Sequence, residues 1–464
     1  MSDSSHITPA QNISEKNEKY IKMTTFPVEK LVLSLACPSI AIMLTSAIYN
    51  ITDTYFVSFL GTSRIGAVGI AFPLMAVIQA MGFFFGQGSG NFMARSLGAK
   101  DYDSAGRMAV TGLVSGFITM VLIAAAGIIF LEPLVECLGA TQTIKPYALE
   151  YILFVLLASP WMAAATILNQ QLRFQGSAAV AMAGMLSGAV LNIILDPIFI
   201  YALSMDVRGA AAATLISQFT SFLILFFYAA SRKGNIPVKI KNFSPSIKRF
   251  AEMFKGGVPA LIRQSLMSIA AVLINHFARP YGDAAIAAIS ISNRLSMFAT
   301  SVVLGFGQGF QPVCGFNYGA KLYDRVKKAF WFCVRFCTSA LFIISVIMAV
   351  FAPNIIALFR KDDLEVIAIG ALGLRLHCIS LPFTAGIIIV NMMTQTMGKA
   401  LEASIVALSR QGIFLFPSLF ILGTLFGLTG IQMARPVSEL ASLIIVVPVM
   451  INALKSLSKY TDNA

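Results

Sequence analysis

The chain has 464 residues, of which 57% are hydrophobic and 12% are charged, and its mean hydropathy is +0.79. Soluble domains carry about 25% charged residues, so this composition excludes an ordinary soluble protein and indicates a membrane protein. The formal net charge is +13, a value that could point to nucleic-acid binding, but the distribution of the basic residues along the chain indicates membrane orientation instead.

Residues 1–25 are polar and lack the charged and apolar regions of a signal peptide, so we expect a short cytoplasmic tail. Beyond them, long apolar runs follow one another; the run from Met108 to Leu131, for example, contains no charged side chain. About 20 apolar residues cross a bilayer as a helix. The chain therefore predicts an all-α polytopic membrane protein with twelve transmembrane helices. We place them at residues 31–58, 64–88, 108–131, 147–171, 178–203, 209–230, 253–278, 285–309, 329–352, 365–393, 403–422 and 427–454.

Lysine and arginine lie mainly on one side of this predicted topology. With the N-terminus inside and successive loops on alternate sides, basic residues on the inner side outnumber those on the outer side by more than three to one. Cytoplasmic loops carry such an excess of basic residues, so both termini are predicted to be cytoplasmic. The basic run from Lys239 to Arg249 is then explained by orientation and by contact with anionic lipids, and we expect no nucleic-acid partner.

The second half of the chain repeats the first. The sequences Phe85-Gly-Gln-Gly and Gly98-Ala-Lys recur as Phe306-Gly-Gln-Gly and Gly319-Ala-Lys, so both pairs differ by the same residue-number shift of 221. Matches this dispersed at one shift indicate an internal duplication. Each copy holds six predicted helices, so both copies have the same membrane orientation and are related by a pseudo-two-fold axis along the membrane normal, as in parallel-repeat transporters. The predicted units are a cytoplasmic tail (1–25), an N-lobe (26–230), a cytoplasmic linker (231–250), a C-lobe (251–455) and a C-terminal tail (456–464).

The glycine-rich stretch from Gly86 to Gly90 does not predict a nucleotide site. No strand precedes it, apolar spans surround it, and the chain contains no Gly-Lys-Ser/Thr sequence of the Walker type. The chain also lacks a His-Glu-x-x-His or Gly-x-Ser-x-Gly sequence. We therefore expect neither direct ATP drive, nor an enzyme, nor an organic or metal cofactor.

Two acids lie within predicted membrane spans, Asp53 in the first and Asp196 in the fifth. A carboxylate at bilayer depth costs roughly 2.5–3.5 kcal/mol on insertion scales and is by default a hypothesis of function. Asn192 lies one helical turn before Asp196 and on the same helix face, and Pro197 frees the backbone carbonyl of Ile193. Such oxygens bind a hard cation, and a buried carboxylate also binds a proton near neutral pH. The alternative is a hydrogen-bonded pair of acids that serves only helix packing.

Together these features resemble the MATE (multidrug and toxic compound extrusion) family, and most closely its prokaryotic MepA/DinF-like branch, over residues 30–455. The resemblance implies an N-lobe site for the coupling cation, formed by residues of the first, fifth and sixth helices. The positions that match in this sequence are Asp53, Asn192, Asp196 and Thr214. The resemblance further implies a supporting polar network and a proline that lets the first helix bend. The matching residues are Tyr49, Tyr151, Asn169 and, for the bend, Pro38.

The C-lobe departs from other branches of the family, which carry acids in its seventh, eighth or tenth helices. The repeat counterpart of the first-helix acid is Ile274, and the seventh and tenth helices offer His276 and His377, which are better explained as hydrogen-bonded structural residues. Coupling is therefore expected through the N-lobe alone. Arg435 and Glu439 lie one helical turn apart and are expected to pair.

The resemblance implies a secondary active exporter of the plasma (inner) membrane, which exchanges amphipathic, often cationic, organic compounds for H⁺ or Na⁺ by alternating access. Adaptable apolar surfaces suit such substrates; candidates near the cavity are Phe72, Met75, Phe83 and Met185. Two alternatives stay open, a lipid-linked precursor flippase, which usually has fourteen spans and a more cationic cavity, and a narrow-substrate metabolite exporter. We expect small-molecule and lipid partners and a monomer, and the sequence does not choose between H⁺ and Na⁺.

Overall fold

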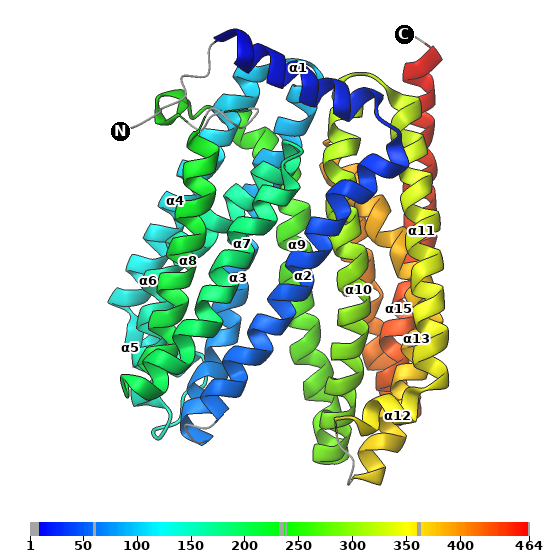
Figure 1. The fold of residues 1–464 in the computed structure, drawn as a ribbon. Coiled ribbons are helices and arrows are strands. Elements are labelled where there is room, and N and C mark those ends of the chain that lie inside the picture. The colour runs from blue at the N-terminus through cyan, green and yellow to red at the C-terminus, as the bar shows by residue number, and fades with distance from the viewer. Residues whose placement is uncertain (1–8, 59–61, 232–235, 237–238, 360–362, 463–464) are drawn as a thin grey trace.

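The computed structural model describes residues 9–58, 62–231, 236, 239–359 and 363–462, without the side chains of residues 9–16, 46–55, 57–58, 62, 240 and 459–462. Helices make up nearly all of this part of the chain (Figure 1). The α-helices are α1 (Pro9–Thr25), α2 (Val28–Ser58), α3 (Thr62–Gly98), α4 (Tyr102–Ile129), α5 (Leu131–Cys137), α6 (Lys145–Phe174), α7 (Ala178–Pro197), α8 (Val207–Ala230), α9 (Ile247–Ala278), α10 (Gly282–Gly319), α11 (Tyr323–Val350), α12 (Ala352–Ala357), α13 (Leu364–Thr396), α14 (Ala400–Leu408) and α15 (Leu415–Asp462). Short 3₁₀ or π segments are η1 (Ile198–Ala202), η2 (Ile240–Asn242), η3 (Arg279–Tyr281) and η4 (Ser409–Ile413).

The twelve predicted membrane spans are confirmed within the described residues. Ten apolar helical stretches are long enough to cross a membrane. One of them contains both α9 and α10, and another contains two spans, the first made of α14, η4 and the start of α15, and the second of the rest of α15. The two parts of α15 meet at Gly427, whose φ of 60° and ψ of −134° are not helical. Asp206, its counterpart in the N-lobe by the repeat shift, has φ 57° and ψ −140°, so both lobes enter their last helix with the same backbone conformation.

The internal repeat is visible in the helix bounds. Both ends of α4 and α11 are related by the repeat shift of 221, and the first residues of α7 and α14 are related by a shift of 222. The same contact also recurs in both lobes: Asn169 Nδ2 donates to the carbonyl oxygen of Ala181 (3.1 Å), and Asn391 Nδ2 donates to that of Ala403 (2.6 Å). These paired bonds fix the register between the two copies at the shift of 222 here.

We expect Asn169→Ala and Asn391→Ala each to lower the free energy of unfolding by about 1–2 kcal/mol, because each change removes a buried hydrogen bond between two helices. Thermal unfolding of the purified protein in detergent measures the effect. Thr220→Ala is the matched control, since it removes an exposed hydroxyl that bonds only within its own helix. Midpoints for both asparagine variants equal to that of the control would contradict the expectation.

The two lobes are in closest contact at the end of the molecule where α1 and the C-terminal part of α15 lie (Figure 1). A Cβ atom added to Gly98 of α3 would lie 2.0 Å from the carbonyl oxygen of Phe316 in α10, and one added to Gly319 would lie 2.0 Å from the carbonyl oxygen of Arg95. The two contacts are related by the shift of 221. Only glycine permits so close an approach of two backbones, so α3 and α10 cross here without any side chain between them.

Polar side chains support this inter-lobe contact. Thr396 Oγ1 donates to Asn91 Oδ1 (2.9 Å), Gln395 Nε2 donates to Gln87 Oε1 (2.9 Å), and Arg95 Nη1 donates to the carbonyl oxygen of Thr396 (2.8 Å). Gln87 belongs to the glycine-rich stretch, which lies inside α3 and not in a loop. The stretch therefore has a structural role, and α3 continues to Gly98, well beyond the predicted end of this span at residue 88.

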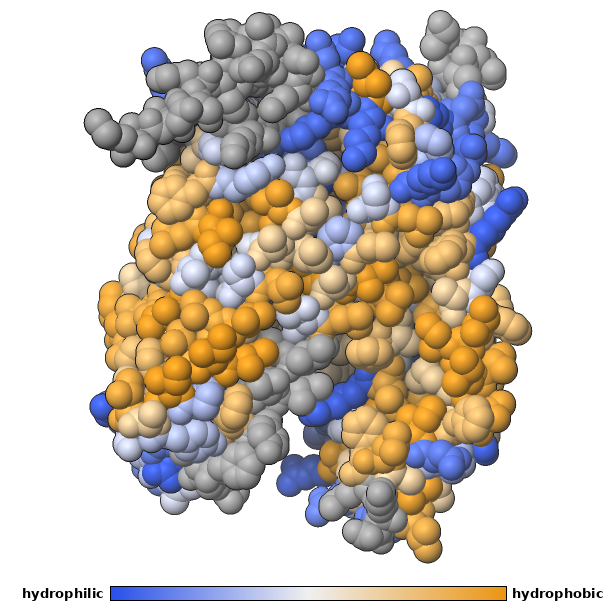
Figure 2. Space-filling view, viewed as in Figure 1, coloured by the Kyte–Doolittle hydropathy of each residue, from blue (hydrophilic) through white to orange (hydrophobic). Residues whose placement is uncertain are grey.

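Hydrophobic side chains cover the middle of the molecule, and hydrophilic ones gather where α1 lies (Figure 2). At the opposite end, the same view shows an opening between the lobes (Figure 2). The lobes are thus closed at one end and apart at the other.

Helices also extend into three of the predicted units outside the lobes, namely the N-terminal tail, the linker and the C-terminal tail. Residues 9–25 form helix α1 where the sequence predicted only a tail, and Asn317 Nδ2 holds the end of this helix through the carbonyl oxygen of Met23 (3.1 Å). Helix α9 begins at Ile247, inside the predicted linker, because Ser246 Oγ caps it by accepting from the backbone N–H of Arg249 (3.3 Å). Helix α15 continues to Asp462, into the predicted C-terminal tail.

Candidate cation site

Helices α7 and α8 bring together three of the predicted site residues. Asn192 and Asp196 lie one turn apart on α7, and Thr214 faces them from α8; their exposed fractions are 1%, 0% and 1%. The Asn192 amide nitrogen is 3.3 Å from Asp196 Oδ1 and 3.4 Å from Thr214 Oγ1. A carboxylate, an amide and a hydroxyl therefore share one buried site, as the spacing of Asn192 and Asp196 predicts.

The orientation of the Asn192 amide follows from its neighbours. With oxygen and nitrogen exchanged, the nitrogen donates to Asp196 Oδ2 (3.1 Å) and the oxygen accepts from the backbone N–H of Thr214 (3.2 Å), so both atoms meet complementary partners. Either orientation joins the same three residues. In the exchanged form Asn192 holds the carboxylate and also ties α7 to the backbone of α8.

The chain after Asp196 leaves the regular α-helix. Pro197 has no N–H to donate to the carbonyl of Ile193, and the next residues, Ile198–Ala202, form a π-turn. Such wide turns occur frequently at functional sites because they re-aim backbone carbonyls and side chains. The candidate cation site thus lies directly beside a local break in α7.

Two predicted site residues, Asp53 and Tyr49, have side chains outside the described part of the chain. Their backbone belongs to α2, which packs along α7. The placement of Asp53 beside Asp196 therefore stays a prediction from the sequence.

The other predicted residues, Tyr151 and Asn169, lie at different distances from Asp196. Tyr151 is fully buried, in one cluster with Ile200 and Ala211, which are about one turn from Asp196 and Thr214 respectively. Asn169, by contrast, bonds to Ala181, near the start of α7. With a helical rise of about 1.5 Å for each residue, Ala181 and Asp196 are roughly 22 Å apart along α7, so the structure does not bring Asn169 to Asp196.

Pro38 lies in α2 at the contact between the lobes. A Cβ atom on Gly309 of α10 would lie 2.5 Å from Ala36 Cα, and one on Gly305 would lie 2.7 Å from Ile40 Cα. Pro38 falls between these two contact points, and it also interrupts the hydrogen bonding of α2. A change of bend at Pro38 would therefore alter how α2 packs on α10.

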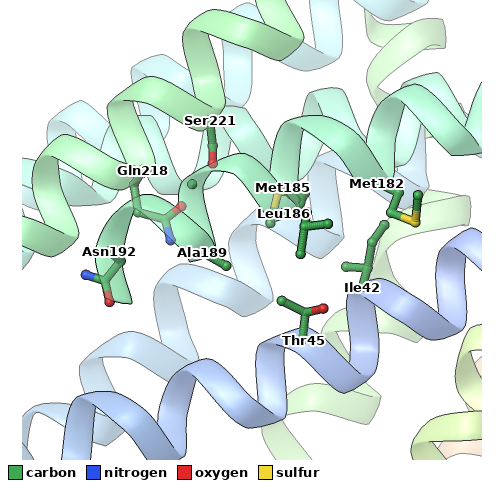
Figure 3. A pocket seen from close by; sticks show the side chains of 10 residues that line it. Ile42, Thr45, Met182, Met185, Leu186, Ala189, Asn192, Gln218 and Ser221 are labelled. Atoms are coloured by element: carbon green, nitrogen blue, oxygen red, sulfur yellow. The ribbon is translucent and has the colours of Figure 1, made fainter. Parts of the chain in front are cut away.

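A cavity opens directly beside the candidate cation site. Figure 3 shows Thr45 of α2 on one side, Gln218 of α8 on the other, and Met182 and Met185 of α7 along the wall. Asn192 lines this cavity and also bonds to Asp196. Of the four apolar residues that the sequence suggested near the cavity, Met185 lines it, whereas Phe72 on α3 is 48% exposed at the surface.

The C-lobe contains a buried acid that is neutralised by arginines. Glu439 of α15 is 4% exposed and accepts from Arg410 Nη2 (2.9 Å), Ser380 Oγ (2.6 Å) and Thr384 Oγ1 (2.8 Å). The predicted pairing with Arg435 is confirmed, at 3.9 Å, but Arg410 is the closer partner. Arg410 is too far from Glu439 along the chain for their spacing to have signalled this pair. This carboxylate is fully engaged and does not resemble Asp196 in its surroundings.

The two histidines of the C-lobe differ in their surroundings. His377 is buried and its Nδ1 lies 3.1 Å from Ser296 Oγ, which agrees with a hydrogen-bonded structural histidine, and His276 is exposed. Within the described residues, no three or more His, Cys, Asp or Glu side chains gather as they would around a metal ion.

Known proteins resemble this chain along most of its length. The MatE family model matches residues 38–198 and again residues 259–421, and the starts of the two matches differ by the same shift of 221, which confirms the internal repeat. The chain is 30% identical over 441 residues to the multidrug export protein MepA of Staphylococcus aureus (strain MSSA476), covering 93% of this chain and 96% of that protein. It is 29% identical over 428 residues to MepA of Staphylococcus haemolyticus (strain JCSC1435), covering 91% and 93%.

A solved structure shares the whole fold. The outward-facing conformation of a multidrug resistance MATE family transporter of the MOP superfamily superposes with a TM-score of 0.88 at 26% identity, over 95% of this chain and 98% of that one. The twelve helices, the duplicated lobes and the two family matches lead to one conclusion: the chain is a membrane transporter, not an enzyme, and belongs to the MATE family.

Proposed function

We propose that the protein exports amphipathic and cationic organic compounds in exchange for H⁺ or Na⁺, with the coupling ion bound in the N-lobe at Asp53, Asn192, Asp196 and Thr214. Its MepA relatives are multidrug export proteins, which supports an efflux role and a broad range of small-molecule substrates.

One observation carries the coupling part of this proposal. Asn192 lines the N-lobe cavity, the one with Met182 and Met185 in its wall, and also bonds to Asp196. A proton or Na⁺ that binds Asp196 changes which hydrogen bonds the carboxylate oxygens accept. The Asn192 amide, which bonds to this carboxylate, then reorients. Because Asn192 lines the cavity, the shape of the cavity wall changes as well. A ligand shifts an equilibrium only through a difference in affinity between two states, and Asn192 supplies a physical route for that difference.

In the proposed cycle, the structure described above is the outward-open state. The positive-inside rule assigns the end that carries α1 and the hydrophilic surface to the cytoplasm, so the opening at the other end faces outside. Ion binding at Asp196 expels substrate from the N-lobe cavity. The lobes then part at the glycine contacts between α3 and α10, a bend at Pro38 accompanies this movement, and the ion leaves to the cytoplasm.

The membrane potential drives the exchange only when net charge crosses the membrane, as it does when one ion exchanges for a neutral substrate. One charge that crosses about 100 mV provides about 2.3 kcal/mol. For a neutral substrate exchanged one for one, this corresponds to roughly a 50-fold gradient, because about 1.4 kcal/mol is tenfold. A chemical gradient of the same ion adds to this value. For a monocationic substrate exchanged one for one, the two charge movements cancel and the chemical gradient of the ion is the driving force.

We expect cells that express the chain to export a fluorescent cationic dye in a manner that depends on one ion gradient. The proton gradient and the Na⁺ gradient are collapsed separately, and dye efflux is followed by fluorescence. If efflux is lost when one of the two gradients is collapsed, the ion of that gradient is the coupling ion. Normal efflux without either gradient, or no efflux from cells with well-expressed protein, would refute ion-coupled multidrug export.

A further inference from the structure

The C-lobe has a cavity of its own, with a different lining. It lies between α9, α13, α14 and η4. Two arginines face it, Arg263 from the middle of α9 and Arg410 from η4, and its other walls include Ile387, Ile388 and Val406. The cavity therefore combines a basic side with an apolar side.

This cavity is the repeat counterpart of the N-lobe cavity. Arg263 corresponds to Ile42 by the shift of 221, and Arg410 corresponds to Gly188 by the shift of 222; both N-lobe residues line the N-lobe cavity. The shift of 222 is the one that the Asn169 and Asn391 hydrogen bonds fix in this part of each lobe. The two lobes thus share one cavity architecture, but guanidinium groups replace an aliphatic side chain and a glycine.

Positive charge exceeds negative charge around the C-lobe cavity. Glu439 pairs with Arg410 at 2.9 Å and lies 3.9 Å from Arg435, while Ser380 and Thr384 occupy its other oxygen. Among the described residues, Glu439 is thus the one acid beside two arginines, Arg410 and Arg435, and Arg263 adds a third positive charge. The carboxylate is therefore unable to neutralise a third guanidinium.

Arg263 itself has no acidic partner in the described part of the chain. Its one hydrogen bond goes from Nη1 to Asn391 Oδ1 at 3.3 Å. A guanidinium carries five N–H donors in a planar fork that fits a carboxylate or phosphate. Ionisable groups at membrane depth are costly and commonly mark a pathway for substrates or ions. Arg263 therefore has N–H donors that an anionic group could occupy.

We propose that the C-lobe cavity binds the carboxylate or phosphate group of an amphipathic organic anion, between Arg263 and Arg410, with the apolar body against Ile387, Ile388 and Val406. This inference rests on the proposed export function for one point, that the bound anion is transported. It widens the substrate class from cations to anionic and zwitterionic compounds. The N-lobe cavity would take the apolar or cationic parts, and the C-lobe cavity would take the anionic group.

Binding of 1-naphthoate to the purified full-length chain tests the site without any transport. The protein is placed in phosphatidylcholine nanodiscs and titrated by calorimetry with 1-naphthoate and with the neutral, similarly shaped 1-naphthamide. We expect 1-naphthoate to bind more tightly. Arg263→Gln is expected to weaken 1-naphthoate binding by about ten-fold or more, because a charge-assisted hydrogen bond is lost. Arg263→Lys, which keeps the charge, is expected to recover part of the affinity.

Arg375→Gln is the matched control, because Arg375 is an exposed C-lobe arginine whose Nε donates to the carbonyl oxygen of Ala349 and which lies outside this cavity. It should bind 1-naphthoate as the unchanged protein does. A melting temperature for Arg263→Gln close to that of the control excludes misfolding as the cause of weaker binding. Equal affinities for 1-naphthoate and 1-naphthamide, or for Arg263→Gln and the unchanged protein, would overturn the proposal.

Nanodiscs that also contain phosphatidylglycerol distinguish the two sources of the anionic group. One outcome is that phosphatidylglycerol competes with 1-naphthoate in the unchanged protein but not in Arg263→Gln. That result would support the site and identify a lipid phosphate as its occupant. The lack of competition would support a soluble organic anion. Cationic dye export is measured on the same proteins: export without 1-naphthoate binding refutes the anion site alone, and binding without export refutes the proposed function alone.

Discussion

Asp196→Asn is expected to abolish ion-coupled dye export while leaving the protein folded in the membrane. The new amide has the shape of the old carboxylate and is able to keep a hydrogen bond to Asn192, so the contacts between α7 and α8 persist. It has neither a negative charge for Na⁺ nor a site that takes up a proton near neutral pH. Uncoupled movement at best equilibrates the dye across the membrane, so the gradient that the unchanged protein builds should vanish.

Dye accumulation in cells of matched expression level measures this loss. Glu365→Gln serves as the control, because Glu365 is an exposed acid of the C-lobe and its neutralisation should leave the gradient intact. Asp53→Asn is expected to behave like Asp196→Asn. A full gradient in both aspartate variants would remove the N-lobe cation site from the mechanism.

Gly98→Ala and Gly319→Ala are each expected to open the closed end of the molecule. The added Cβ would lie 2.0 Å from a backbone carbonyl oxygen of the other lobe, and a backbone atom cannot rotate away as a side-chain end does. Overpacking a tight contact costs roughly 1–3 kcal/mol. By the rule of about 1.4 kcal/mol for each factor of ten, this shifts the conformational equilibrium by roughly five- to more than a hundred-fold. Export should fall because the state in which the lobes are closed at the α3–α10 contact becomes rare, and the proposed cycle needs this state.

The native thiol of Cys314 reports this opening. Cys314 is fully buried on α10, and the adjacent Gly315 packs against Ala94 of α3. Maleimide labelling of Cys314, followed by peptide mass spectrometry, should be slow in the unchanged protein and faster in both glycine variants. The buried Cys333 within α11 is an internal reference that should not change.

Gly386→Ala is the matched control for the glycine variants. A Cβ atom at Gly386 of α13 would meet nothing within 4 Å, so this change should alter neither labelling nor export. If Cys314 stays protected in Gly98→Ala and Gly319→Ala, the glycine contacts are not what keeps the lobes closed.

Much of the fold follows from the sequence because its signals are strong and local. Runs of apolar residues fix the number of spanning helices, and one constant shift between matching segments fixes the duplication and the shared orientation of the lobes. The end of α3 was predicted too early, because the Gly86–Gly90 stretch is mostly glycine, which weakens any helix by itself. Packing against the other lobe stabilises the helix there, and no local pattern in the sequence carries that information.

The candidate site shows the same division. Asn192 and Asp196 lie one turn apart in sequence, so helix geometry alone predicts that they meet, whereas Thr214 on the next helix was placed only through the family resemblance. Asn169 came by the same route, and the structure places it about four turns from Asp196. Arg410 and Glu439 pair across two helices, and spacing along the chain does not predict such contacts.

The reciprocal glycine contacts between α3 and α10 also bear on the ancestry of the chain. Gly98 meets Phe316, and its counterpart Gly319 meets Arg95, itself the counterpart of Phe316. This is the pattern of an isologous interface, in which residue i touches j and j touches i across a two-fold axis. Two separate six-helix subunits with one common sequence would make the same contact. The interface has therefore kept the form of a homodimer, while the cavity positions at Ile42 and Arg263 have diverged since the two halves were joined.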